Sequence, residues 1–97
     1  MTTLPNMKVL APADTESAKA AFDIALATPG PVFTRLMRDP LFDFYDPKES
    51  FELGGSKTIR TGNDITIAAY GDMVIQALQA AELLSHKGIE AEVIDFY

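Results

Sequence analysis

The alternation of apolar and polar positions in residues 9–37 predicts a strand, a helix and a second strand. A short apolar run at residues 9–11 comes first. Four apolar residues then recur at i, i+3, i+4 and i+7 and form one stripe of a helix: Ala18, Ala21, Phe22 and Ala25. Asp14 is suited to cap this helix, and Pro29 with Gly30 ends it before the strand "PVFTRLM". Connections this short between the helix and the two strands predict a right-handed strand-helix-strand unit with parallel strands.

The pattern of residues 56–97 predicts a second unit of a different kind. Two extended runs flank residues 61–64, and the Gly62-Asn63 step favours an antiparallel hairpin between them. A helix is expected over residues 73–87, with Gly88 just beyond its end. Its buried face is apolar: Val74, Ala77, Leu78, Ala81 and Leu84. The sequence "AEVIDFY" is then another strand, so the unit reads β, β, α, β.

Residues 39–53, "DPLFDFYDPKESFEL", have the composition of a linker between the two units. They contain two Asp-Pro steps and no sustained hydrophobic period. Four aromatic residues are dispersed along them: Phe42, Phe44, Tyr45 and Phe51. A free tether would rarely carry so many aromatics, so we expect the linker to lie along a surface. The predicted division is residues 1–38, linker 39–53 and residues 54–97.

Both units contain too few elements to be complete α/β domains. Parallel sheets normally have both faces covered, and neither unit has enough helices to cover two faces. The chain also stops on an apolar strand that carries Ile94, Phe96 and Tyr97 without a turn or polar tail. We therefore expect a section of a larger protein, or an obligate oligomer.

Composition narrows the range of partners and compartments. The 97 residues are 47% hydrophobic and 23% charged, as in an ordinary globular protein. The net charge of −6 disfavours general attraction to nucleic acid or anionic lipid. The absence of cysteine excludes disulfides and thiolate chemistry, and the sequence has neither a secretory signal pattern nor an apolar run of membrane-spanning length. A cytoplasmic location is the expectation.

Two arginines in "GPVFTRLMRDP" are the strongest candidates for binding chemistry. Arg38 falls at the carboxyl end of the second predicted strand, where ligands of open α/β sheets bind, and its guanidinium group could clamp a phosphate. Alternatively, it pairs with Asp39 or another carboxylate at the linker edge. Arg35, three residues earlier on the same predicted strand, would point to the opposite face and bridge to a neighbouring element or subunit.

The remaining candidates have simpler structural interpretations. Gly71 and Asp72 could form a ligand-binding turn, but a turn glycine followed by a helix cap is the commoner arrangement. His86 fits a solvated helix end better than a metal site. Asp43 and Asp46 are the nearest approach to an acid and base pair, although Asp46 is explained by its position before proline. No phosphate-cradling glycine motif is present, since the glycines at 54–55 precede a strand.

Two longer stretches resemble the C-terminal section of transketolase-type thiamine-diphosphate enzymes. They are "LPNMKVLAPADTESAKAAFDIALATPGPVFTRLMRD" and "GNDITIAAYGDMVIQALQAAELLSHKGIEAEVIDFY". The resemblance implies that residues 1–38 finish a pyrimidine-binding domain with a parallel sheet. It also implies that residues 54–97 begin a three-layer α/β/α C-terminal domain with one antiparallel strand. The motifs that hold the diphosphate and metal, and the catalytic glutamate and histidines, belong to parts of the family outside this sequence.

The resemblance also implies a function. The complete enzyme would transfer a two-carbon ketol unit between phosphorylated sugars with thiamine diphosphate and Mg²⁺ as cofactors. This section would supply packing to the rest of the enzyme and to an oligomeric partner, and Arg38 matches the position that binds the substrate phosphate. We expect no cofactor or metal bound by this section alone, and no activity from it alone. A section of a 1-deoxyxylulose-5-phosphate synthase, in which two arginines share this spacing, and a non-catalytic α/β interaction module remain as alternatives.

Overall fold

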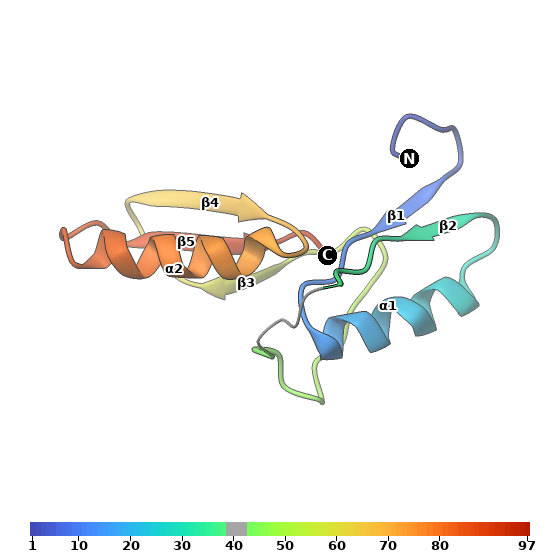
Figure 1. Ribbon diagram of the computed structural model, residues 1–97, viewed down its shortest axis with the longest axis horizontal. Helices are drawn as coiled ribbons and strands as arrows, with labels where there is room; N and C mark the ends of the chain where they lie inside the picture. Colours follow the sequence, from blue (N-terminus) through green and yellow to red (C-terminus); the bar gives the residue numbers. More distant parts are fainter. Residues whose placement is uncertain (39–42) are drawn as a thin grey trace.

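The computed structural model describes residues 1–38 and 43–97, which form two α/β halves placed end to end (Figure 1). The long axis is about twice either of the others, with extents of 46 × 27 × 23 Å. The elements in chain order are β1 (Lys8–Leu10), α1 (Thr15–Ala27), β2 (Val32–Thr34), β3 (Lys57–Arg60), β4 (Ile65–Ala69), α2 (Met73–Ser85) and β5 (Ala91–Asp95).

The first half is the predicted strand-helix-strand unit. β1 and β2 pair in parallel, in a register that sets Lys8 opposite Val32 and Leu10 opposite Thr34. α1 begins with a capping box, in which Asp14 and Ser17 satisfy each other's backbone N–H groups. The helix ends at Thr28, whose extended backbone is the conformation preferred before a proline.

Two details of this half differ from the prediction. β2 ends at Thr34, because β1 offers no further ladder partner after the Leu10 carbonyl accepts the Arg35 N–H at 2.8 Å. Arg35 therefore follows the strand and does not lie within it. Phe22, expected on the buried stripe, is 65% exposed, since a two-stranded sheet is too narrow to cover more than the small residues of α1.

The second half is a three-stranded sheet in the order β3-β5-β4. β4 runs parallel to β5 and β3 runs antiparallel to it, so the expected single antiparallel strand is present. The predicted hairpin between β3 and β4 is wrong, because β5 lies between these strands. The Gly62 segment passes closely over the start of β5, where a Cβ on Gly62 would be 2.4 Å from the Ala91 carbonyl carbon.

α2 covers one face of this sheet (Figure 1). The centre of the core is formed by small residues and one valine: Ala77, Ala81, Ala91 and Val93. Partly buried aliphatic side chains surround it, among them Ile59, Ile67 and Leu78. Small side chains on the buried face let the helix lie close to the sheet. The helix ends at Ser85, two residues before the predicted bound, and Gly88 follows it with a φ of +78°.

The described part of the linker packs against the second half, as expected for its aromatic content. Phe44, Tyr45, Phe51 and Tyr97 form a continuous series of ring contacts with centroid separations of 4.6, 4.9 and 4.8 Å. Phe42, also part of the expectation, lies outside the described residues. Neither helix of the described chain is long and apolar enough to cross a membrane.

Candidate functional site

The carboxyl ends of the parallel strands from both halves meet near the middle of the molecule (Figure 1). Just past the end of β4, the Gly71 N–H donates to the carbonyl of Ala11, which directly follows β1, at 3.1 Å. A hollow of about 410 Å³ lies at this junction. Its wall includes Phe33, Arg35, Tyr70 and Phe96, and we call it the junction hollow.

Arg35 is the cationic side chain among the residues that line the junction hollow. Its backbone is held by the hydrogen bond to Leu10, while its side chain is exposed among three aromatic rings. The expected bridge to a neighbouring element is not formed within residues 1–38 and 43–97, where Arg35 has no ion pair. The position is suited to an anionic ligand, because a guanidinium group both stacks on aromatic rings and binds oxyanions.

Arg38 lies four residues beyond the end of β2, is exposed, and is not part of the junction hollow. It has no ion pair with any carboxylate of the described residues. The alternative pairing with Asp39 concerns a residue outside the described ranges. The shorter β2 thus places Arg35, and not Arg38, directly at the strand's carboxyl end.

A buried set of polar side chains joins the halves through the linker, and sequence reasoning missed it. Asp14 accepts hydrogen bonds from the backbone N–H groups of Phe44 and Tyr45 at 3.0 and 2.8 Å, besides capping α1. The Tyr45 hydroxyl donates to Asp95 Oδ2 at 2.6 Å. Asp95 is fully buried at the end of β5, so the chain of bonds runs from α1 to the second sheet.

Burial governs the acidity of this set. Desolvation raises the pKa of Asp95 to about 6, although the hydrogen bond from Tyr45 favours its ionised form. Desolvation, with the bond to Asp95, also raises the pKa of the Tyr45 hydroxyl far above its ordinary value. By contrast, hydrogen bonds from Thr15 lower the pKa of the exposed Asp43. In the sequence, one feature could have indicated this buried polar set. It is the aspartate inside the apolar run "VIDFY", because an aspartate can be buried only if it is paired.

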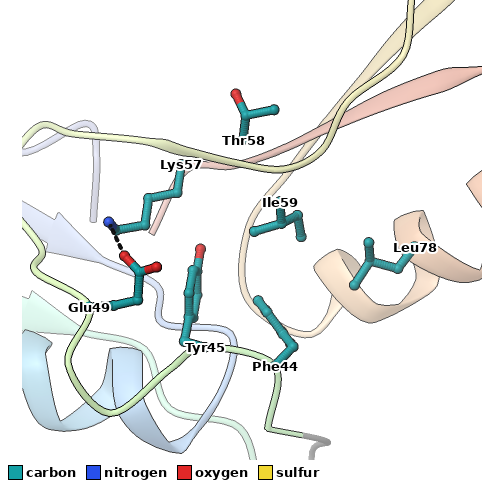
Figure 2. Close-up of a pocket in the computed structure, with 7 residues that line it drawn as sticks. All are labelled: Phe44, Tyr45, Glu49, Lys57, Thr58, Ile59 and Leu78. Atoms are coloured by element: carbon teal, nitrogen blue, oxygen red, sulfur yellow. Dashed lines mark hydrogen bonds and ion pairs between the residues drawn. The ribbon is translucent and has the colours of Figure 1, made fainter.

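A second hollow, of about 470 Å³, lies between the linker and β3 (Figure 2). Its wall includes Phe44, Tyr45, Glu49, Lys57 and Ile59, and we call it the linker hollow. Lys57 on β3 binds Glu49 on the linker at 2.7 Å and lies 5.0 Å from the centre of the Phe51 ring. This hollow is therefore closed at one side by an ion pair between the two segments.

The other candidate residues from the sequence have local structural roles or exposed positions. Gly71 is buried, adopts a φ of +61° and makes the turn into α2, as its commoner interpretation predicted. Asp72 is the N-cap residue, but its side chain caps no N–H group, so that part of the prediction is wrong. His86 is exposed near Glu82 at the end of α2. Asp43 binds the Thr15 N–H and Asp46 the Lys48 N–H, so both stabilise local backbone.

The acidic side chains of the described residues are not arranged as a metal site. Within residues 1–38 and 43–97, no three side chains of His, Cys, Asp or Glu are placed to hold a metal ion. Asp14 and Asp95 are already engaged in the buried set, where both accept hydrogen bonds from the linker. What the arrangement offers chemically is anion binding at the junction hollow.

These features define an α/β protein of two sheet units, with the described part of the linker packed against the second unit and the carboxyl ends of the parallel strands meeting between the units. The chain belongs to the transketolase family. Residues 54–97 match the family model described as "Transketolase, C-terminal domain". A solved structure described as a split gene transketolase, inactive beta4 tetramer, superposes with a TM-score of 0.94 and 40% identity over 98% of this chain and 32% of that one.

Curated relatives extend over both halves of the chain. A 6-deoxy-6-sulfo-D-fructose transketolase subunit from Clostridium sp. (strain MSTE9) is 42% identical over 100% of this chain and 30% of its own length. An apulose-4-phosphate transketolase subunit from Phocaeicola vulgatus is 35% identical over 96% of this chain and 30% of its own length. A 1-deoxy-D-xylulose-5-phosphate synthase from Synechococcus elongatus is 36% identical over 95% of this chain and 15% of its own length. The chain thus spans less than a third of the length of each.

Proposed function

We propose that this chain is a section of a transketolase that transfers a two-carbon ketol unit between phosphorylated sugars. The observation that carries the proposal is the position of Arg35 and Arg38 after β2, beside the edge where the strands of both halves end. Open α/β sheets bind ligands at such edges. The section contributes domain and dimer packing and a substrate-phosphate contact, and it is not expected to be active alone.

Arg38 is the phosphate contact of this proposal, with Arg35 as its secondary candidate. A guanidinium group can hold a phosphate through two parallel N–H···O bonds, which a lysine cannot reproduce. Arg38 is exposed and its guanidinium group is unpaired within the described ranges. Arg35 competes for the role, because a ligand in the junction hollow would meet it first.

The cofactors of the complete enzyme, thiamine diphosphate and Mg²⁺, are part of the proposal through the family. Thiamine diphosphate supplies the carbanion chemistry when it is bound. We expect neither group to be bound by this section alone. The task of its residues is to bind the far end of the substrate and to keep the two halves in register, so that the phosphate contact has a defined position.

The partners follow from the same family. We propose a complementary section that completes the enzyme, a homo-oligomeric assembly and a cytoplasmic location. Relatives described as transketolase subunits support the first of these. Neither nucleic acid nor a membrane is proposed as a partner.

Replacement of Arg38 in the complete enzyme tests the phosphate contact. Loss of a charge-assisted contact is worth about 2–3 kcal/mol, so Arg38→Ala should lower kcat/KM for a phosphorylated ketose roughly 30- to 150-fold. The unphosphorylated ketose should be affected little, because it lacks the group that Arg38 binds. Arg35→Ala is measured in parallel, and Lys87→Ala, which removes an exposed cation beyond α2, serves as the control.

The outcomes separate the candidates. An equal loss for both ketoses would contradict a phosphate role for the residue replaced. A selective loss in Arg35→Ala alone would move the contact to Arg35. Product analysis with pyruvate and glyceraldehyde phosphate distinguishes the 1-deoxyxylulose-5-phosphate synthase alternative, which the Synechococcus elongatus relative supports. A complete protein without either activity would favour the interaction module.

A further inference from the structure

The buried carboxyl group of Asp95 has one oxygen without a partner. Oδ2 accepts the Tyr45 hydroxyl, whereas Oδ1 is shielded from solvent and has no hydrogen-bond partner among the described residues. Buried polar atoms are nearly always satisfied, and an exception calls for a physical explanation. An ionised Asp95 would need a donor at Oδ1, and a neutral Asp95 could carry its proton there.

Lys57 is the cation best placed to serve that oxygen. In the antiparallel pairing of β3 with β5, Lys57 is directly opposite Asp95. Side chains of such a pair emerge on the same face of the sheet, with Cβ atoms roughly 5 Å apart. The flexible four-carbon stem of a lysine can turn its ammonium group toward either side of such a position.

In the structure, Lys57 pairs with the linker and not with Asp95. Its ammonium group binds Glu49 at 2.7 Å and lies over the Phe51 ring, and the dashed line in Figure 2 marks the pair with Glu49. Figure 2 also shows the Tyr45 ring standing between Phe44 and this pair, with its hydroxyl directed toward β3. Glu49 and Asp95 are therefore two carboxyl groups that can compete for one lysine.

We propose that Lys57 exchanges between Glu49 and Asp95, and that the charge on Asp95 decides which of them it binds. While Asp95 is neutral, Lys57 binds Glu49 and fastens the linker to β3. Ionisation of Asp95 creates a buried carboxylate beside Lys57, which attracts the ammonium group and releases Glu49. The ion pair at the side of the linker hollow is thus a latch that opens when rising pH removes the proton from Asp95.

The other charged or titratable groups near Asp95 are consistent with this arrangement. The Asp14 carboxylate, reached through Tyr45, opposes ionisation of Asp95, while the Tyr45 hydroxyl favours it. The Tyr97 hydroxyl, two residues along the chain, is occupied as acceptor for the Glu52 N–H. Among these groups Lys57 is the only cation, so it alone could neutralise an ionised Asp95.

The test uses Glu49→Gln, which removes the competing charge from an exposed linker position. The pKa of Asp95 is measured in the protein by following its side-chain carboxyl ¹³C shift against pH by NMR. Freed from Glu49, Lys57 should bind Asp95 and increase its acidity about tenfold or more, toward the ordinary aspartate range. Glu52→Gln is the matched control, because it removes one linker carboxylate that has no ion pair in the described chain.

A double substitution separates exchange from a general charge effect. In Lys57→Met/Glu49→Gln the increase in acidity should vanish, because no ammonium group is left to bind Asp95. An Asp95 pKa that is unchanged in Glu49→Gln would overturn the proposal, as would equal shifts in Glu49→Gln and Glu52→Gln. The measurement does not involve catalysis, so its failure would be independent of the proposed transketolase function.

Discussion

At the scale of single residues, Gly62 and Gly54 are each required for a different physical reason. Gly62 lies where the chain crosses the start of β5, and an added Cβ would come within 2.4 Å of the Ala91 carbonyl carbon. Gly54 has a φ of +77° but no atom within 4 Å of the Cβ position. The first is required for space and the second for backbone conformation. The backbone of Ala91 cannot yield without breaking the sheet, so the first requirement should be the stricter.

Gly62→Ala should destabilise the protein by about 3 kcal/mol or more, since an overpacked site must displace backbone atoms. Gly54→Ala should cost only about 1 kcal/mol, the strain of a side chain at positive φ. Urea unfolding of both variants measures the difference. Equal destabilisation would show that the crossing of the Gly62 segment over β5 is looser than the structure has it.

At the scale of elements, the two helices begin with an aspartate that does different work in each. Asp14 caps α1 and also binds two N–H groups of the linker, all while buried. Asp72 precedes α2 with helical backbone angles and no side-chain cap. The sequence predicts both as caps, because each precedes an apolar helical stripe. Only the structure reveals that Asp14 also holds the linker.

Asp14→Ala should therefore cost more than an ordinary cap. Loss of the cap is worth about 1 kcal/mol, and the buried linker N–H groups lose a charged acceptor besides, so we expect about 3 kcal/mol. Asp72→Ala should change the free energy of unfolding by less than about 0.5 kcal/mol. Thermal or urea unfolding compares the pair, and similar losses for both would contradict the linker role of Asp14.

The elements that depend on local chemistry could be predicted, whereas their order in the sheet could not. The helix around residues 73–85, the glycine that follows it and the parallel first unit can be predicted from periodicity, caps and short connections. The insertion of β5 between β3 and β4 depends on contacts made by a strand that comes later in the chain. Gly62 resembles a turn residue in the sequence, because a close approach to Ala91 leaves the same local signal.

The candidate site was predictable to a similar extent. The arginines could be identified because guanidinium groups in an apolar run need a partner. Their placement depended on where β2 ends, and that is decided by the length of β1. Tyr45 and Asp95 could not be paired from the sequence, since a hydrogen bond between residues fifty positions apart leaves no periodic signal.

At the scale of the whole molecule, few contacts keep the two halves in register. The molecule is elongated, and the halves meet through the Gly71 to Ala11 hydrogen bond and the linker bonds of Asp14, Tyr45 and Asp95. Both hollows lie beside these contacts. The protonation state of Asp95 should therefore affect the stability of the molecule and the setting of its ligand-facing edge together.

The free energy of unfolding should fall as the pH rises from about 4 to above 6. The pKa of Asp95 is about 6 in the folded protein against 3.8 in a free side chain, so the folded state binds more protons in this window. With roughly 1.4 kcal/mol for each pKa unit, the loss is about 3 kcal/mol and is complete above the folded pKa. Asp43 acts in the opposite sense, but only below its ordinary pKa of 3.8.

Urea unfolding at pH 4.5 and pH 7 should show about 2 kcal/mol of this loss, because part of it falls below pH 4.5. Asp95→Asn is the control that cannot titrate. The control should lose the pH dependence, and a parallel fall in both proteins would assign it to other groups. Tyr45→Phe should increase the dependence, because the hydroxyl bond favours the ionised carboxylate. Glu49→Gln should reduce it if Lys57 moves to Asp95, because the added ammonium group stabilises the same ionised form. The two variants act on one carboxyl group with opposite signs, and a general change in stability could not produce that result.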